Sequence, residues 1–154
     1  MSIETERKFL VKGEEGRHGA TCTRIRQSFL AIDSVRTVRV RVVDDKGFLT
    51  IKGRSTGISR EEYEYEIPHD DAPALLSSIC LPQQIEKVRY AVGFGSHIWE
   101  VDVFEGKNAG LIVAEIELSD ANERFDLPAW AGTEVSHDLR YFKANLMLRP
   151  YSTW

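Results

Sequence analysis

Acidic side chains stand two residues apart at several places in this chain. The pairs are Glu4-x-Glu6, Glu62-x-Glu64, Glu100-x-Asp102 and Glu115-x-Glu117. On a β-strand, residues i and i+2 point to the same face and lie about 6.5–7 Å apart. Two carboxylates at that spacing can converge on one divalent cation. Because no cluster of His or Cys accompanies them, the oxygen donors favour a hard ion, Mg²⁺ or Mn²⁺.

Basic side chains repeat with the same spacing in other segments. The pairs are Arg24-x-Arg26, Arg39-x-Arg41, Lys52-x-Arg54 and Lys87-x-Arg89. Pairs of Arg and Lys on neighbouring strands can bind successive phosphate groups, and the guanidinium of Arg offers a two-pronged fork. We therefore predict a phosphate chain as the ligand of these cations.

The alternative is an ordinary amphipathic sheet, whose polar face points to solvent. For a single strand that alternative is the better interpretation. Here, however, pairs of one sign recur in nearly every strand, and like charges side by side on a sheet are unfavourable. A ligand that combines divalent cations with a polyanion would supply both counter-charges, so we predict that the pairs point into a closed interior.

Alternation with period two dominates the chain and predicts strands. The expected strands span 2–10, 20–31, 35–44, 47–54, 59–68, 84–94, 97–104 and 111–118. Short connections favour antiparallel neighbours, and about eight strands closed into a barrel leave room for a small ligand. The expected fold is α+β, mainly β: a closed eight-stranded antiparallel β-barrel with a few helices.

Two segments break this period and predict helices. Residues 69–76 carry acids and a proline at their start, which is typical of a first helical turn. Residues 137–148 place Leu139, Phe142 and Leu146 at helical spacing, with Ser136 as the N-cap. We expect this second helix to line or close one end of the barrel, with Arg140 and Lys143 as a basic pair one turn apart. The alternative is an amphipathic helix packed on the outside, with both cations in water.

Composition narrows the class of protein. With 154 residues, 42% of them hydrophobic, the chain is expected to form one domain over 1–154. The net charge of −4 argues against nucleic acid as a partner. No apolar run or leader pattern is seen, so we expect a cytoplasmic protein without membrane association, with Cys22 and Cys80 reduced. Trp99 and Tyr90 are expected in the core rather than against a nucleobase.

Taken in order, the motifs resemble one known family. They are E-x-E-x-K at 4–8, V-R-V-R at 38–41, L-T-I-K-G at 49–53, E-x-E at 62–64, K-x-R at 87–89 and E-x-E at 115–117. The series resembles the CYTH domain of the triphosphate tunnel metalloenzymes. The resemblance implies an eight-stranded tunnel that binds a triphosphate with divalent metal. Phe29 departs from the pattern, because many small bacterial members have Tyr there.

Roles for single residues combine this resemblance with the needs of phosphoryl transfer, which are charge neutralisation and alignment. The predicted phosphate-binding residues are Arg39, Arg41, Lys52, Lys87 and Arg89, with Arg24, Arg26 and Arg54 in addition. By similarity to the family, the metal ligands are Glu4, Glu6, Glu115 and Glu117. Glu62, Glu64 and Asp102 are candidates for a second metal or for orienting the attacking water, and Lys8 for polarising that water or contacting the terminal phosphate.

The predicted function is metal-dependent hydrolysis of inorganic triphosphate. One alternative is a class IV adenylate cyclase, although the compact chain offers no evident extra loop for an adenine pocket. Another is a non-catalytic polyphosphate- or nucleotide-binding barrel, which would not need so many paired acids. A homodimer is compatible with the sequence, which does not decide the oligomeric state.

Overall fold

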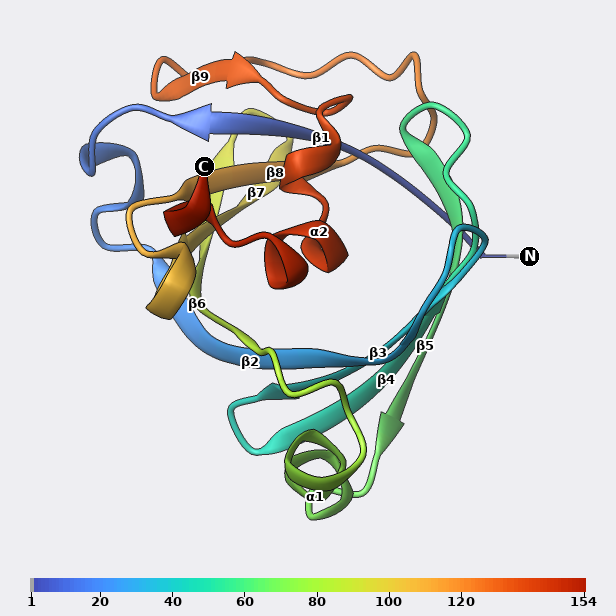
Figure 1. Ribbon diagram of the computed structural model, residues 1–154. Coiled ribbons are helices and arrows are strands. Elements are labelled where there is room, and N and C mark those ends of the chain that lie inside the picture. The colour runs from blue at the N-terminus through green and yellow to red at the C-terminus, as the bar shows by residue number, and fades with distance from the viewer. Residues whose placement is uncertain (1) are drawn as a thin grey trace.

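The computed structural model describes residues 2–154 and shows a closed antiparallel barrel. Figure 1 looks along its axis. The strands are β1 (Ile3–Val11), β2 (Thr21–Ile32), β3 (Thr37–Val43), β4 (Lys46–Lys52), β5 (Ser59–Ile67), β6 (Ile85–Phe94), β7 (His97–Phe104), β8 (Ile112–Glu117) and β9 (Ala131–Glu134). Around the barrel they follow the order β5-β4-β3-β2-β6-β7-β8-β1, and β1 returns to β5. The predicted eight-stranded barrel is confirmed, with each predicted strand bounded to within two residues.

Strand β1 closes the barrel by changing partners along its length. Ile3 pairs with Glu61 of β5, whereas Lys8 pairs with Glu115 of β8. Near its end, Phe9 pairs with Glu134 of β9, a short strand that the sequence pattern did not predict. Closure leaves no free edge between β5 and β8, which removes the usual route to edge-to-edge aggregation.

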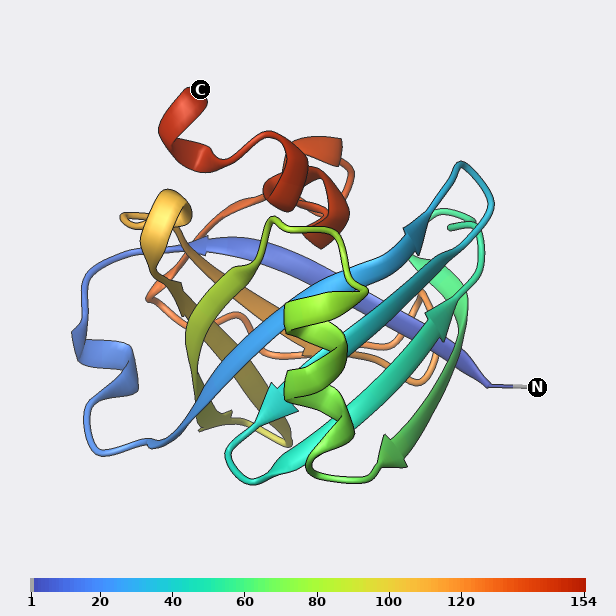
Figure 2. The same ribbon diagram turned by 60° about the horizontal axis from the view of Figure 1, so that its bottom comes forward.

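Two of the three hydrophobic clusters lie on the outer face of the barrel wall, and the third fills the barrel end beneath the C-terminal segment. In β3, Val40 faces outward and packs under Ala72 and Leu76 of helix α1 (Asp71–Ser78). Figure 2 shows α1 lying across the outer face of these strands. The predicted helix at 69–76 is thus confirmed, shifted by two residues. Because the apolar residues are used on the outer face, alternation turns their polar neighbours into the barrel.

A second apolar cluster covers the outer face on the opposite side. Trp99 is completely buried, with its ring edge-on to Phe9 at 5.5 Å between centroids and to Trp130 at 5.5 Å. Phe125 completes the group, and Tyr90 packs at its margin. The prediction that Trp99 and Tyr90 belong to the core is therefore confirmed.

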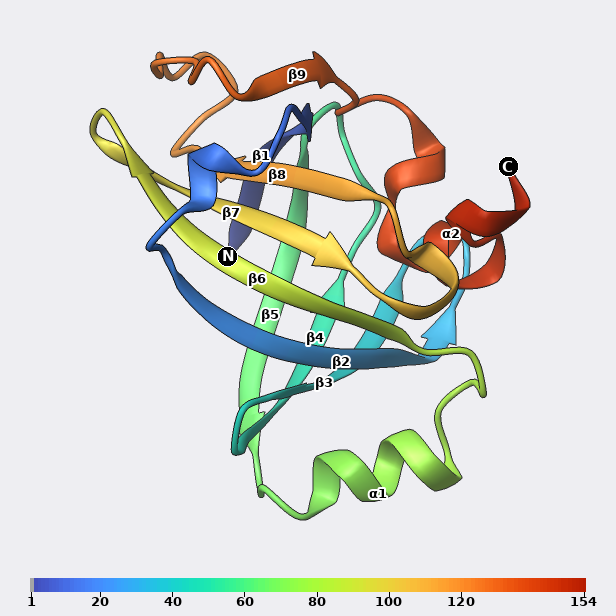
Figure 3. The same cartoon turned by 90° about the vertical axis from the view of Figure 1, so that its left-hand side faces the viewer.

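One end of the barrel is covered by the C-terminal segment (Figure 3). It contains helix α2 (Lys143–Leu148), whose Leu146 and Met147 are buried against Phe29 and Ile85. Short 3-10 turns occupy Glu15–Arg17, Gly106–Asn108, Leu139–Tyr141 and Tyr151–Thr153. Across residues 2–154, none of the helices is long and apolar enough to span a bilayer.

The single helix predicted over 137–148 is wrong in extent. A 3-10 turn and α2 are separated by Phe142, whose backbone is extended at φ −68° and ψ 135°. Ser136 does not cap a helix; its hydroxyl accepts the backbone N–H of Lys8 at 2.9 Å. The break separates residues that the helical spacing had placed on one face: Leu146 is buried at the barrel end. Leu139 instead remains 64% exposed.

Candidate active site

The barrel encloses a cavity of about 550 Å³, lined by charged side chains and by one face of the C-terminal segment. This is within the usual size of small-molecule sites, roughly 300–1,000 Å³. The inward side chains come from alternate positions of the strands, so the i, i+2 pairs share the interior. The prediction that Arg39, Arg41, Glu115 and Glu117 point into the barrel is confirmed by their place in the cavity lining.

The strand order sorts the lining charges by sign. Strands β4, β3 and β6 contribute Lys52, Arg39, Arg41 and Arg89, with β2 between β3 and β6. Strands β7, β8, β1 and β5 are also contiguous, and they contribute Glu100, Glu115, Glu117, Glu4, Glu6, Glu62 and Glu64. We call these two groups the cationic wall and the acidic wall. The charged lining is therefore positive along one side and mainly negative along the other, where Lys8 and Arg60 are the basic members.

The cationic wall holds more positive charge than its partners neutralise. Arg41 donates from Nε to Oε1 of Gln27 at 3.2 Å, and within residues 2–154 it forms no ion pair. Burial and the neighbouring Arg39 and Arg89 lower the pKa of Arg41 to about 9. In the same described part of the chain, the buried Nε of Arg39 has no hydrogen-bond partner. This donor is available to an incoming acceptor, and beside the charged Arg41 an anionic one is favoured, since an unpaired buried donor is costly.

The acidic wall shows the opposite imbalance. Glu6 lies directly across from Glu117 in the β1–β8 pairing. Burial, followed by the nearby carboxylate of Glu115, raises the pKa of Glu6 to about 8. Burial and the charges of Glu4 and Glu100 also raise the pKa of Glu117. The carboxylates thus compete for too little positive charge.

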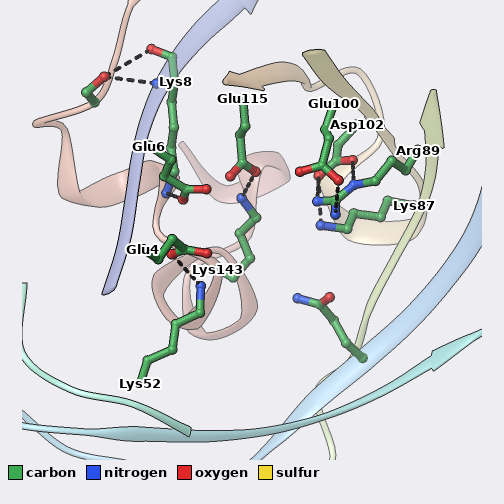
Figure 4. A network of polar contacts seen from close by, with 12 residues as sticks. Glu4, Glu6, Lys8, Lys52, Lys87, Arg89, Glu100, Asp102, Glu115 and Lys143 are labelled. Carbon is green, nitrogen blue, oxygen red and sulfur yellow. Dashed lines mark hydrogen bonds and ion pairs between the residues drawn. The ribbon is translucent and has the colours of Figure 1, made fainter. Parts of the chain in front are cut away.

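Ion pairs within the cavity lining meet part of this need (Figure 4). The Nζ of Lys52 lies 2.9 Å from Glu4 and 3.2 Å from Glu62. Arg89 reaches Glu100 at 3.0 Å. Lys8, a basic member of the acidic wall, lies 3.5 Å from Glu6. Each of these contacts can open when a ligand supplies a stronger partner.

The carboxylate donors of the acidic wall suit a divalent cation, but their side chains are not gathered into a coordination site. Among residues 2–154, no three acid, His or Cys side chains are gathered as tightly as a bound ion would require. The ammonium groups of Lys52, Lys8 and Lys143 lie beside the carboxylates instead. The oxygen-only donor set and the raised pKa of Glu6 both indicate that a further cation would be bound favourably.

Residues 2–151 match the CYTH domain family. The chain belongs to the CYTH family. It is 48% identical to an inorganic triphosphatase of Acetivibrio thermocellus over 154 residues, which is 100% of this chain and 99% of the relative. It is 34% identical to an inorganic triphosphatase of Nitrosomonas europaea over 151 residues, covering 94% of this chain and 97% of the relative. A crystal structure of an inorganic triphosphatase superposes with a TM-score of 0.65 at 30% identity, covering 96% of each chain.

Most of the predicted site residues of this CYTH protein line its cavity. They are Glu4, Glu6, Lys8, Arg39, Arg41, Lys52, Glu62, Glu64, Arg89, Glu115 and Glu117. Arg54 follows the end of β4 and contributes only to the mouth, where it is exposed. Their roles in binding or catalysis stay predictions.

Arg24 and Arg26 were wrongly predicted to face the interior. Both are exposed on the outer face of β2, and Arg24 pairs there with Glu105. The register explains the error: Arg26 stands opposite outward Val42, whereas Gln27 stands opposite inward Arg41. Polar residues occupy both faces of β2, so alternation alone could not distinguish its inner face.

Lys87 and Asp102 lie within the wall rather than at the cavity surface. Both are completely buried, and Nζ of Lys87 donates to Oδ2 of Asp102 at 2.7 Å. Arg89 donates to both oxygens of Asp102, at 2.7 and 3.0 Å. Neither Lys87 nor Asp102 contributes to the cavity lining. In this conformation Asp102 orients Arg89, and its oxygens are already occupied.

Several lining residues were missed by the sequence prediction. Arg60 faces Glu4 across the β1–β5 pairing and donates twice to the carbonyl of Gly53, at 2.9 and 2.7 Å. Arg60 lies two residues before Glu62 on β5, so alternation places it on the same face as Glu62 and Glu64. This spacing could have identified it. Glu100 had been noted as inward but given no role. Lys143 had been placed beside Arg140 on one helix face.

The expected basic pair of the C-terminal segment is divided between two environments. Arg140 is exposed and pairs with Asp138 at 2.7 Å. Lys143 is buried and pairs with Glu115. Phe142, Lys143 and Ala144 line the cavity, so the segment does line one end of it.

Proposed function

We propose that this CYTH protein hydrolyses inorganic triphosphate with the help of Mg²⁺ or Mn²⁺. The observation that carries the proposal is the sorting of charge into a cationic wall and an acidic wall facing one cavity. A phosphate chain fits the first and divalent cations fit the second. The two triphosphatase relatives, aligned over nearly their whole length, support the choice of substrate.

On the cationic wall, Arg39, Arg41 and Arg89 would bind the phosphate oxygens, and Lys52 would bind them from β4. They would neutralise the charge on the phosphate chain as water attacks the terminal phosphorus and the bridging P–O bond breaks, giving phosphate and pyrophosphate. Arg39 is well oriented for this role, because its NH2 group donates to Oγ1 of Thr50 at 3.1 Å.

On the acidic wall, Glu4, Glu6, Glu115 and Glu117 would hold the cation. A bound divalent ion supplies positive charge beside the phosphate oxygens and polarises water. Glu64 is the candidate for orienting the attacking water: its carboxylate is 39% exposed and is fixed by Thr50, which donates to it at 2.8 Å. Glu62 and Lys8 lie on the same wall and would support that arrangement.

A panel of substrates tests the proposal directly. Tripolyphosphate, ATP and thiamine triphosphate are each incubated with the protein and Mg²⁺, Mn²⁺ or a chelator. We expect metal-dependent phosphate release, fastest from tripolyphosphate, because the cavity is lined by charge along both walls. Faster formation of cyclic AMP and pyrophosphate from ATP would instead assign a cyclase. Tight binding of tripolyphosphate without turnover would assign a binding protein.

Replacing Arg41 tests the cationic wall with little risk to the fold. Arg41 forms no ion pair within residues 2–154, so Arg41→Leu leaves no carboxylate unpaired. We expect the KM for tripolyphosphate to rise roughly tenfold or more, since a hydrogen bond to a charged group contributes about 1.5–3 kcal/mol. The Tm should change little, because relief of the repulsion with Arg39 and Arg89 offsets the loss of the hydrogen bond to buried Gln27.

The matched control is Arg26→Leu, which removes the same charge from the outer face of β2. Its KM should equal that of the unchanged protein. Equal KM values for Arg41→Leu and Arg26→Leu would show that the cationic wall does not bind the substrate.

A further inference from the structure

Lys143 reaches the acidic wall from a helix, whereas the residues of that wall come from strands. It is the first residue of α2, and its Nζ bonds to Oε1 of Glu115. Figure 4 shows it reaching from the helix toward the carboxylate. Both side chains are nearly inaccessible, with 12% and 6% of their surface exposed. A buried ion pair of this kind contributes little net stability, because desolvation of its charges offsets much of their attraction. Stability alone therefore does not explain it.

Lys143 lies among carboxylates that would otherwise need another counter-ion. Glu115 of β8 stands opposite Lys8 of β1, and the carboxylate of Glu6 on that strand lies 3.5 Å from the Lys8 ammonium. Lys143 therefore lies where negative charge from several strands accumulates. Glu117, the second acid of β8, stands directly opposite Glu6. The Lys143 ammonium thus acts as the counter-ion of the carboxylates on β1 and β8.

A divalent cation and the Lys143 ammonium cannot both bind Glu115 at this position without strong repulsion. Two like charges about 4 Å apart in a partly buried site repel by several kcal/mol, and a double charge increases the cost. One of the two must leave the carboxylate. Lys143 can do so, because its long side chain needs only to rotate while the helix stays in place.

The anchoring of α2 allows such a local exchange. Leu146 and Met147 are buried in the apolar cluster at the barrel end, with 0% and 3% exposure. Upstream, Ser136 is held by the backbone of Lys8 at 2.9 Å. The helix is therefore fixed on both sides of Lys143, and only the side chain is free to change partner.

We propose that Lys143 is a built-in counter-ion that competes with the divalent metal for Glu115. In the metal-free protein it neutralises the acidic wall and keeps the barrel from unfavourable repulsion. It also weakens metal binding until a phosphate chain arrives, which gives the released ammonium a new anionic partner. Metal and triphosphate then bind with positive coupling, since each relieves the cost of the other. This inference depends on the proposed function and assigns regulation to the same site.

The test is calorimetric titration of Mn²⁺ into the protein without any triphosphate. The variants are Lys143→Met, which removes the charge but keeps the length of the side chain, and Lys143→Arg, which keeps the charge. We expect Lys143→Met to bind Mn²⁺ roughly tenfold more tightly than the unchanged protein, the effect of losing one charge-assisted competitor. Lys143→Arg should bind Mn²⁺ as weakly as the unchanged protein.

Lys107→Met is the control for net charge, because Lys107 is exposed in the turn at Gly106–Asn108. It should leave the Mn²⁺ affinity unchanged. Thermal unfolding verifies that each variant is folded. Should Lys143→Met fail to fold, Lys143→Gln replaces it, since the amide still donates to Glu115 without carrying charge.

In a second titration, tripolyphosphate is added to each variant in the presence of a metal chelator. This measures binding of the anion without divalent metal. If Lys143→Met binds Mn²⁺ no more tightly than the unchanged protein, Lys143 does not compete with the metal. If Lys143→Met loses only affinity for tripolyphosphate, Lys143 is a simple phosphate ligand. Absence of Mn²⁺ binding in every variant, with tripolyphosphate present or not, would overturn the proposed metal dependence itself.

Discussion

Glu117→Gln is expected to reduce metal-dependent hydrolysis of tripolyphosphate by about 10³-fold, since bound metal contributes several kcal/mol to charge stabilisation in such reactions. Glu117 stands opposite Glu6 and lines the cavity. Among residues 2–154 it takes part in no ion pair. Burial, followed by the charges of Glu4 and Glu100, raises its pKa. Glutamine keeps the shape and removes the charge, so the fold should be unaffected.

The measurement is kcat at saturating tripolyphosphate over a wide range of Mn²⁺ concentrations, together with Mn²⁺ affinity. Glu61→Gln is the matched control, because Glu61 lies exposed on β5 and only accepts a hydrogen bond from Tyr63 at 2.8 Å. It should retain full activity. Comparable kcat values for the two variants at saturating Mn²⁺ would remove Glu117 from the metal site.

The fold was accessible from the sequence because a barrel imposes one simple rule on each strand. Every second residue of 38–42 and of 99–103 is apolar, and these residues face the outer clusters. The same rule placed Arg39, Arg41, Glu115 and Glu117 inside without any knowledge of their partners. Local alternation is thus enough to sort residues between wall and cavity where one face is clearly apolar.

The separation into two walls could not be predicted in the same way. It depends on β6 following β2 around the barrel and on β1 closing against both β5 and β8. These are long-range pairings, and no short pattern encodes them. The result is that pairs of one sign, scattered along the chain, become neighbours in space.

The failures have equally local causes. In β2, Ile25 and Gln27 face inward beside Lys87 and Arg41, although Arg24 and Arg26 form the more conspicuous pair. Charge predicts the wrong inner face for β2. The burial of Lys143 depends on a break at Phe142 that helical spacing does not reveal.

Asp102→Asn is expected to destabilise the protein by about 3–5 kcal/mol, the usual cost of breaking a buried ion pair. Asp102 is completely buried and accepts hydrogen bonds from Lys87 at 2.7 Å and from Arg89 at 2.7 and 3.0 Å. The amide leaves the Lys87 ammonium buried without a counter-charge. Urea unfolding followed by the fluorescence of buried Trp99 measures the loss, and Asp45→Asn, in an exposed turn, is the control.

The pH dependence of this loss provides an independent check. Burial would raise the pKa of Asp102, but Lys87 and Arg89 outweigh it and hold that pKa below its ordinary value. A group with a lowered folded-state pKa stabilises the protein above its unfolded pKa, about 3.9, and loses that contribution as the pH falls through the folded value. The difference in unfolding free energy between the unchanged protein and Asp102→Asn should therefore be constant from about pH 5 to 8 and shrink only in stronger acid.

The double variant Asp102→Leu with Lys87→Met separates the cost of an unpaired charge from the value of the pair. Replacing both partners with apolar residues removes the orphaned ammonium, so much of the stability lost in Asp102→Asn should return. Activity should not return with it, because Arg89 then lacks the carboxylate that orients it toward the cavity. A double variant as unstable as Asp102→Asn would mean that the loss comes from packing or from unpaired Arg89 rather than from the buried charge of Lys87.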